Sequence, residues 1–204
     1  MKSSLIEFWR ENKIIHSEKL LEAFRKVPRE KFILEDYKDQ AYADIALPLT
    51  KGQTISQPTT VMLMTQALDV NSDNKVLEVG TGSGYQAAIL SYLAREIITT
   101  EIVPEMVSFA KKNLKSYKNV KIIKAKENEL GYKKEAPYDR IIVTAASPEI
   151  QKVLLEQLKP RGIMVVPVGK YSQKMLVIKK DKELKINNLG EFMFVPLKGK
   201  FGFQ

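Results

Sequence analysis

Three glycines at alternate positions give the strongest chemical signal in the sequence. The apolar run Val76–Val79 leads into Gly80-Thr81-Gly82-Ser83-Gly84, and residues 85–94 then have a helical pattern. Glycines at such a turn let the backbone approach a ligand at the helix N-terminus. The spacing differs from the G-x-G-x-x-G fingerprint of dinucleotide-binding proteins, because the residue three after Gly82 is Tyr85. The loop is therefore predicted to bind a ligand of another kind, with a glycine turn that binds nothing as the alternative.

A carboxylate stands at the end of the next apolar run. Ile97–Thr100 is followed by Glu101. The carboxyl ends of parallel strands meet at one edge of a sheet, where α/β proteins bind their ligands and where an acidic residue can accept hydrogen bonds from ribose hydroxyls. We therefore expect Glu101 to bind a ribose. An exposed glutamate at a strand end is the alternative.

The order of residues around the loop resembles the S-adenosylmethionine motif of class I methyltransferases. Glu78, Gly80, Gly82 and Gly84 follow the pattern Glu-x-Gly-x-Gly-x-Gly. S-adenosylmethionine lacks a pyrophosphate but carries an ammonium and a sulfonium group, so an acidic residue near the loop is favourable. The resemblance implies S-adenosyl-L-methionine as the cofactor and S-adenosyl-L-homocysteine as its product.

Further stretches, which together span roughly residues 20–200, narrow the class. The most specific is Gln53-Thr54-Ile55-Ser56-Gln57-Pro58. The others are Ala23–Phe32, Ala41–Asp44, Glu78–Ala88, Ala136–Asp139, Val143–Ala146, Gln157–Pro160, Val166–Gly169 and Phe194–Leu197. These stretches resemble the protein-L-isoaspartate (D-aspartate) O-methyltransferase family, which implies methylation of the α-carboxyl of L-isoaspartyl residues in damaged proteins and peptides. The ester then collapses to a succinimide, which can reopen to normal aspartate.

The resemblance also implies the residues of the site. The expected cofactor-binding residues are Glu78, Gly80, Thr81, Gly82, Ser83, Gly84, Glu101, Glu127 and Leu130, and the expected substrate-binding residues are Thr54, Ile55, Ser56 and Val195. One segment departs from the family pattern. Where the family has Gly-Asp-Gly, whose aspartate approaches the adenine amino group, this chain has the longer Ala125–Glu129. Counting back from Leu130 places Glu127 at the aspartate position.

A carboxylate nucleophile needs little acid–base catalysis, because its reference pKa of roughly 3–4 leaves it ionised at neutral pH. Catalysis then comes mainly from holding it in line with the methyl group, for which effective molarities reach ~10⁵ M or more. An arginine would dampen the nucleophile, whereas the hydroxyls of Thr54 and Ser56 and backbone N–H groups hold it at lower electrostatic cost. We therefore predict that Ser56 is the catalytic residue. Capping of a helix that starts near Pro58 is its alternative role.

Short apolar runs and amphipathic stretches alternate from residue 74 onward, as in βαβ units. This pattern predicts an α/β fold of the class I methyltransferase type, a doubly wound and mostly parallel sheet with a reversed C-terminal hairpin and an N-terminal helical cap. Residues 1–57 are expected to form the cap and substrate loop, and residues 58–204 the cofactor-binding domain, within one compact unit. Strands are expected at Lys75–Val79, Ile97–Glu101, Val120–Lys124, Arg140–Thr144 and Ile163–Val168, with an antiparallel pair at 174–180 and 191–197; helices are expected within 1–35, from Pro58, and at Tyr85–Ala94, Pro104–Leu114 and Pro148–Leu158.

Composition excludes several kinds of site. The 204 residues include no cysteine and one histidine, His16. Disulfides and thiolate catalysis are therefore excluded, and no metal site is expected. The chain has no apolar run of about 18 residues and no signal-peptide pattern at its start, so a cytoplasmic location without membrane contact is expected.

The net charge of +9 invites comparison with nucleic-acid-binding proteins. The lysines are spread along the chain without a basic stretch interleaved with aromatics, which favours a solvated surface. Some nucleic-acid methyltransferases carry an Asn/Asp-Pro-Pro-aromatic motif after the fourth strand, where this chain has Thr144–Pro148. The expected partners are isoaspartyl-containing proteins and peptides and no specific nucleic acid, while the oligomeric state stays open.

Two further functions are compatible with part of the sequence. The glycine loop alone does not exclude a small-molecule O-methyltransferase. A non-catalytic binding module that retains the fold is disfavoured, because both the glycine loop and the stretch Gln53–Pro58 are intact.

Overall fold

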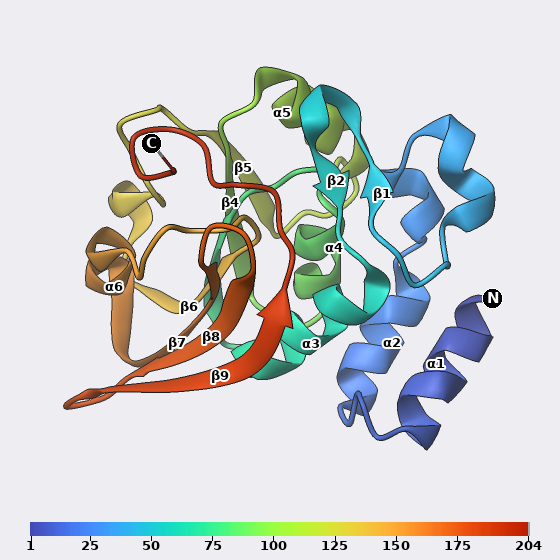
Figure 1. The fold of residues 1–204 in the computed structure, drawn as a ribbon, viewed down its shortest axis with the longest axis horizontal. Helices are drawn as coiled ribbons and strands as arrows, with labels where there is room; N and C mark the ends of the chain where they lie inside the picture. Colours follow the sequence, from blue (N-terminus) through green and yellow to red (C-terminus); the bar gives the residue numbers. More distant parts are fainter. Residues whose placement is uncertain (204) are drawn as a thin grey trace.

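The computed structural model describes residues 1–203 and centres on a seven-stranded sheet. Its strand order is β5-β4-β3-β6-β7-β8-β9, in which the first five run parallel and β8 and β9 form an antiparallel hairpin at one edge (Figure 1). The strands are β3 (Lys75–Val79), β4 (Glu96–Glu101), β5 (Val120–Lys124), β6 (Tyr138–Val143), β7 (Leu158–Val168), β8 (Gln173–Lys180) and β9 (Leu184–Phe192). The predicted fold class is confirmed.

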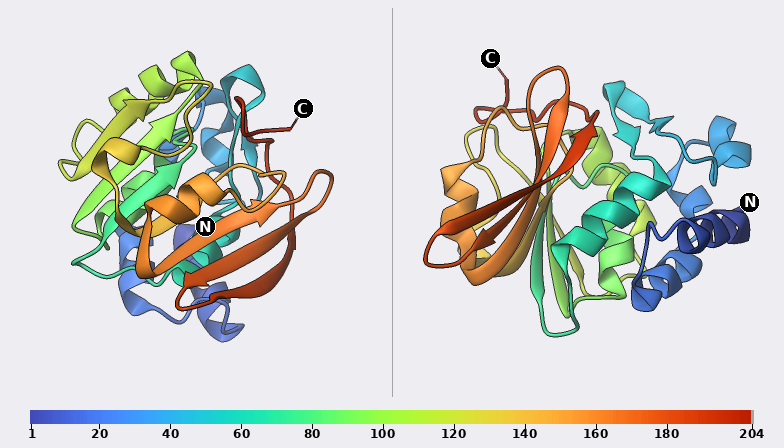
Figure 2. Two further views of the ribbon diagram at one scale, coloured as in Figure 1. Left: turned by 90° about the vertical axis from the view of Figure 1, so that its left-hand side faces the viewer. Right: turned by 60° about the horizontal axis from the view of Figure 1, so that its bottom comes forward.

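The side chains of the inner strands form two hydrophobic layers, one on each face of the sheet, because successive residues of a strand point to opposite faces. Val76 and Ile97 belong to one buried cluster, and Leu77 and Ile98 belong to the other. The first layer is covered by α3 (Pro58–Leu68), α4 (Tyr85–Ser91) and α5 (Pro104–Asn113), and the second by α6 (Lys152–Gln157). Both views of Figure 2 show the twisted sheet between these helices.

The N-terminal segment packs on the first layer. It comprises α1 (Lys2–Glu11), α2 (Glu18–Lys26), short 3₁₀ helices at Arg29–Phe32, Glu35–Gln40 and Thr50–Gly52, and a two-stranded hairpin of β1 (Leu47–Pro48) and β2 (Thr54–Ile55). Trp9 and Phe24 pack edge to face with their ring centroids 4.8 Å apart, and both lie in the same buried cluster as Val76 of β3. Among residues 1–203, none of the helices combines the length and apolar character needed to span a bilayer.

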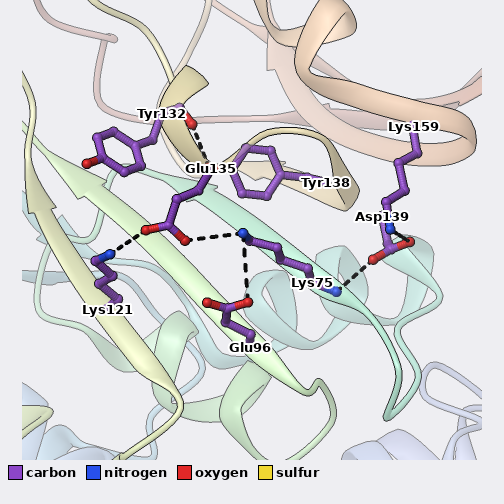
Figure 3. A network of polar contacts seen from close by, with 8 residues as sticks. All are labelled: Lys75, Glu96, Lys121, Tyr132, Glu135, Tyr138, Asp139 and Lys159. Carbon is purple, nitrogen blue, oxygen red and sulfur yellow. Dashed lines mark hydrogen bonds and ion pairs between the residues drawn. The ribbon is translucent and has the colours of Figure 1, made fainter.

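A polar network joins the amino ends of the strands (Figure 3). Lys75 Nζ lies 3.2 Å from Glu135 and 3.8 Å from Glu96, and Lys121 also pairs with Glu135. Asp139 accepts from the Lys75 backbone and from Lys159 Nζ, each at 2.8 Å. The network holds the loop before β6 at this edge, so the opposite, carboxyl edge is the one left for ligands.

Several predicted boundaries were wrong. Helix α4 ends at Ser91 rather than Ala94, β6 spans Tyr138–Val143 rather than Arg140–Thr144, and β7 begins at Leu158 rather than Ile163. Residues 1–35, which were expected to be helical, contain two α-helices, because the chain turns at Lys13 (φ 52°) and restarts where the Ser17 side chain caps α2. Helix α6 starts at Lys152 rather than Pro148, because Ser147 still pairs with Val168. The last strand is β9 rather than 191–197: after Phe192 the chain leaves the sheet edge, with the Phe194 amide donating to Gln173 Oε1 at 2.7 Å.

Candidate active site

The glycine loop lies at the carboxyl end of β3, bent by left-handed residues. Gly80 (φ 99°) has no room for a side chain, since a Cβ there would lie 2.5 Å from Thr144 Oγ1. Gly82 (φ 53°) differs, because no described atom lies within 4 Å of the position of its Cβ. Close packing against Thr144 thus explains why residue 80 is a glycine. At Gly82, only the backbone angle and a ligand in the cavity would restrict a side chain.

Glu78 lies beneath this loop and does not line the cavity. Its Oε2 accepts from Thr99 Oγ1 at 2.5 Å, and Thr99 Oγ1 lies 2.6 Å from Thr81 Oγ1 in the loop. Oε1 has no hydrogen-bond partner among the described residues. Burial, and secondarily the charge of Glu101, raise the pKa of Glu78 to about 8, while the Thr99 hydrogen bond opposes the rise. Glu78 therefore supports the loop from below as a carboxyl group that resists ionisation.

Glu101 ends β4 and faces the cavity. Its Oε2 accepts from the Gly82 amide at 2.8 Å, and its Oε1 accepts from the Ile102 and Val103 amides at 2.9 Å each. A carboxylate has roughly four acceptor sites, so about one remains for a ligand hydroxyl. Glu101 thus shapes the loop as well as facing the ligand space.

The N-terminal segment contributes Thr54 and Ile55 of β2, and Ser56 directly after them, to the lining of the cavity. The Ser56 side chain is half-buried, and its hydroxyl has no hydrogen-bond partner within residues 1–203. The alternative role of Ser56 as a helix cap is wrong. Gln57 occupies the cap position of α3, and Asp44 Oδ1 accepts from the Thr59 amide at 2.9 Å in the first helical turn. The Ser56 hydroxyl is therefore available to a ligand.

The C-terminal segment closes another side of the cavity. Residues Val195–Leu197 run beside Ala146, whose amide donates to the Val195 carbonyl at 2.8 Å and whose carbonyl accepts from the Leu197 amide at 2.8 Å. Val195 lines the cavity together with Lys198. This segment therefore reaches the site although it lies more than 90 residues from Glu101 in the chain.

The loop after β5 supplies the remaining wall, through Ala125, Glu129, Leu130 and Gly131. Glu127 is exposed and is not among the lining residues; its carbonyl accepts from the Lys200 amide at 2.7 Å. The geometry thus favours Glu129 over the predicted Glu127 as the carboxylate that faces a ligand here.

One cavity collects most of the predicted residues. It is lined by Thr54, Ile55, Ser56, Gly80, Thr81, Gly82, Ser83, Glu101, Leu130 and Val195, while Gly84 lies at the start of α4 outside the lining. Sequence reasoning missed Ile102, Val103, Glu129, Lys198, Tyr85 and Gln86, which also line it. Ile102 and Val103 follow directly after Glu101, so the strand-end signal could have found them.

A second cleft adjoins this cavity and shares Thr54, Ser56, Thr144 and Val195 with it. Its other walls come from Ala46, Gln57, Thr60, Ser172 and the segment Glu191–Phe194. The site thus consists of a cavity lined by the glycine loop and a cleft that adjoins it at Ser56.

Comparison with known proteins agrees with this geometry. The family model for protein-L-isoaspartate(D-aspartate) O-methyltransferase matches residues 1–202. A protein-L-isoaspartate O-methyltransferase from Dictyoglomus turgidum is 48% identical over 100% of this chain and 93% of its own, and protein-L-isoaspartate O-methyltransferase 2 from Archaeoglobus fulgidus is 47% identical over 92% and 89%.

Solved structures agree as well. A protein-L-isoaspartate O-methyltransferase superposes with a TM-score of 0.88 at 27% identity, covering 99% of this chain and 67% of its own. A Plasmodium falciparum protein assigned as a protein-L-isoaspartate O-methyltransferase, in complex with S-adenosyl-L-homocysteine, superposes with a TM-score of 0.82 at 27% identity, covering 94% and 95%. The chain belongs to the protein-L-isoaspartate(D-aspartate) O-methyltransferase family.

Proposed function

We infer that this protein transfers a methyl group from S-adenosylmethionine to the α-carboxyl of L-isoaspartyl residues in damaged proteins and peptides. The resulting ester starts repair through a succinimide. One observation carries the inference: in a chain of this family, the glycine loop and the segment Thr54–Ser56 line the same cavity. We propose isoaspartyl-containing proteins and peptides, and no specific nucleic acid, as the partners of this protein.

The residues present fit S-adenosylmethionine. Open space over Gly82 leaves room for a ligand against the loop, and Glu101 offers an acceptor to a ribose hydroxyl. Ile102 and Leu130 offer apolar surface to an adenine, and the carboxylate of Glu101 favours a ligand with cationic groups. We propose that Glu129, rather than Glu127, approaches the adenine amino group.

Methyl transfer to a carboxylate depends on positioning the carboxylate against the methyl group rather than on proton transfer. When bound, the cofactor supplies an electrophilic methyl group on sulfur. Residues 58–204 would hold it, and residues 1–57 would present the substrate loop. The Ser56 hydroxyl, which has no other partner among the described residues, donates to the substrate carboxylate, and the exposed Thr54 lies beside it. A neutral donor orients the carboxylate without neutralising its charge.

Replacement of Glu101 by alanine is expected to weaken S-adenosylmethionine binding by about 1–2 kcal/mol, roughly 5- to 30-fold. The variant loses one charge-assisted hydrogen bond to the ribose, and the amides of Gly82, Ile102 and Val103 lose their acceptor. Titration calorimetry measures the change. Glu96→Ala, at the opposite end of β4, is the matched control and should bind normally. Unchanged affinity in a folded Glu101→Ala protein would assign Glu101 to a structural role alone.

The function itself is tested with labelled S-adenosylmethionine and two peptides that differ only in an isoaspartyl or an aspartyl linkage, plus a transfer RNA. Base-labile methyl ester should form on the isoaspartyl peptide and not on its aspartyl twin. Alkali-stable label on the RNA, with none on either peptide, would contradict the proposed function.

A further inference from the structure

The cleft beyond Ser56 is not needed to hold the cofactor or the reacting carboxylate. Its lining combines the polar residues Gln57, Thr60 and Ser172 with the apolar residues Phe192, Met193 and Phe194. Met193 is 88% exposed. Because the cleft adjoins the reacting position at Ser56, a peptide whose isoaspartyl carboxylate lies there must place a neighbouring residue in or over this cleft.

Glu191 is the one ionisable side chain among the described residues that line this cleft. Its Oε2 accepts from Ser172 Oγ at 2.9 Å, which fixes the carboxylate at the cleft wall. Lys174 stands opposite Glu191 in the β8–β9 register, yet within residues 1–203 no ion pair of 4.0 Å or less joins them. A negative charge therefore faces the cleft in a protein whose net charge is +9.

We propose that this cleft is a subsite for the residue flanking the isoaspartate, and that Glu191 makes it select basic side chains over acidic ones. This subsite deepens the proposed function and rests on it. A lysine or arginine combines an aliphatic stem, which can lie along Phe192 and Phe194, with a cationic end for Glu191. An acidic side chain in the same place would meet a like charge.

The expected effect is moderate, because Glu191 is exposed to solvent. Exposed opposite charges attract weakly and like charges repel to a similar degree. The ratio of kcat/KM for a lysine-flanked over a glutamate-flanked isoaspartyl peptide should therefore fall about three- to ten-fold when Glu191 becomes glutamine. The same ratio should rise in Lys174→Gln, because that change removes the cation across the strand.

The experiment measures kcat/KM for three isoaspartyl peptides whose flanking residue is lysine, glutamine or glutamate, with each flanking side varied in turn. The proteins are the unsubstituted chain, Glu191→Gln, Lys174→Gln and the control Glu183→Gln, which makes the same charge change at the exposed turn before β9. Support requires a lower lysine-to-glutamate ratio in Glu191→Gln only, and a smaller difference between the proteins at 0.5 M salt, since screening weakens exposed charges.

Two different outcomes overturn the subsite, and they are distinguishable. In the first outcome, the glutamine-flanked peptide is methylated, but the lysine-to-glutamate ratio of kcat/KM is equal in Glu191→Gln and the unsubstituted chain, or falls as much in Glu183→Gln. The cleft then does not select flanking residues by charge, and the proposed function stands. If none of the isoaspartyl peptides is methylated, the proposed function fails and the subsite fails with it.

Discussion

Ser56→Ala is expected to lower kcat/KM for an isoaspartyl peptide by roughly 5- to 150-fold, the equivalent of about 1–3 kcal/mol of transition-state stabilisation. The hydroxyl lines both the cavity and the cleft and, among the described residues, has no competing partner. It can therefore donate to a substrate carboxylate without breaking another bond. S-adenosylmethionine affinity should barely change, because the predicted cofactor contacts lie on the glycine loop and Glu101.

The same substitution should leave stability nearly unchanged, within about 0.5 kcal/mol. A capping serine would behave differently and cost about 0.5–2 kcal/mol on replacement, but the first turn of α3 is bonded by Asp44 instead. Peptide kinetics and a denaturant midpoint on one preparation separate the two roles. Ser116→Ala, an exposed serine before β5, is the control. A fully active Ser56→Ala protein would remove the hydroxyl from the catalytic step.

Local patterns sufficed for the strand that leads into the glycine loop and for the start of the helix after it, although that helix ends at Ser91 rather than Ala94. The predicted Lys75–Val79 and Val120–Lys124 coincide with β3 and β5, and predicted α5 differs by one residue at its end. In these segments the apolar residues recur at a regular spacing, and residues that end a helix or strand follow them. Both signals lie within a few neighbouring residues. The glycine loop was located for the same reason, since its glycines directly follow the predicted strand and precede the predicted helix.

Local sequence patterns could not predict the contacts between segments that are distant in the chain. Asp44 bonds the start of α3 from 15 residues away, so no local cap signal marks it. The cleft depends on the segment Glu191–Val195 crossing the sheet edge, which follows from where the β8–β9 hairpin ends. The contact between Arg29 of the N-terminal segment and Tyr85 of α4 was equally hidden: Arg29 is 0% exposed and stacks at 5.0 Å over the Tyr85 ring, and its burial lowers its pKa. From sequence alone, an arginine is expected at the surface.

Glu78→Gln is expected to stabilise the protein at neutral and mildly alkaline pH, by an amount that grows with pH. The pKa of Glu78 rises from 4.5 to about 8 on folding, first because of burial and then because of Glu101. At a pH below the unfolded pKa of 4.5, Glu78 is protonated in both the folded and the unfolded chain, so the free energy of unfolding at this pH is the reference. Between the two values the unfolded chain releases the proton and the folded chain keeps it, so the free energy of unfolding falls by about 1.4 kcal/mol per pH unit. Above the higher value the loss levels off.

A glutamine at this position does not titrate, so the variant lacks this loss. Its free energy of unfolding minus that of the unsubstituted chain should increase between pH 5 and pH 8 by up to several kcal/mol, on the order of 3. Urea unfolding at pH 5, 6, 7 and 8 measures this difference, with Glu183→Gln as the exposed control that should show little pH trend. The glutamine can still accept from Thr99, so the support of Thr81 and the glycine loop is kept. A pH-independent difference would mean that Glu78 is already ionised beneath the loop in the folded chain.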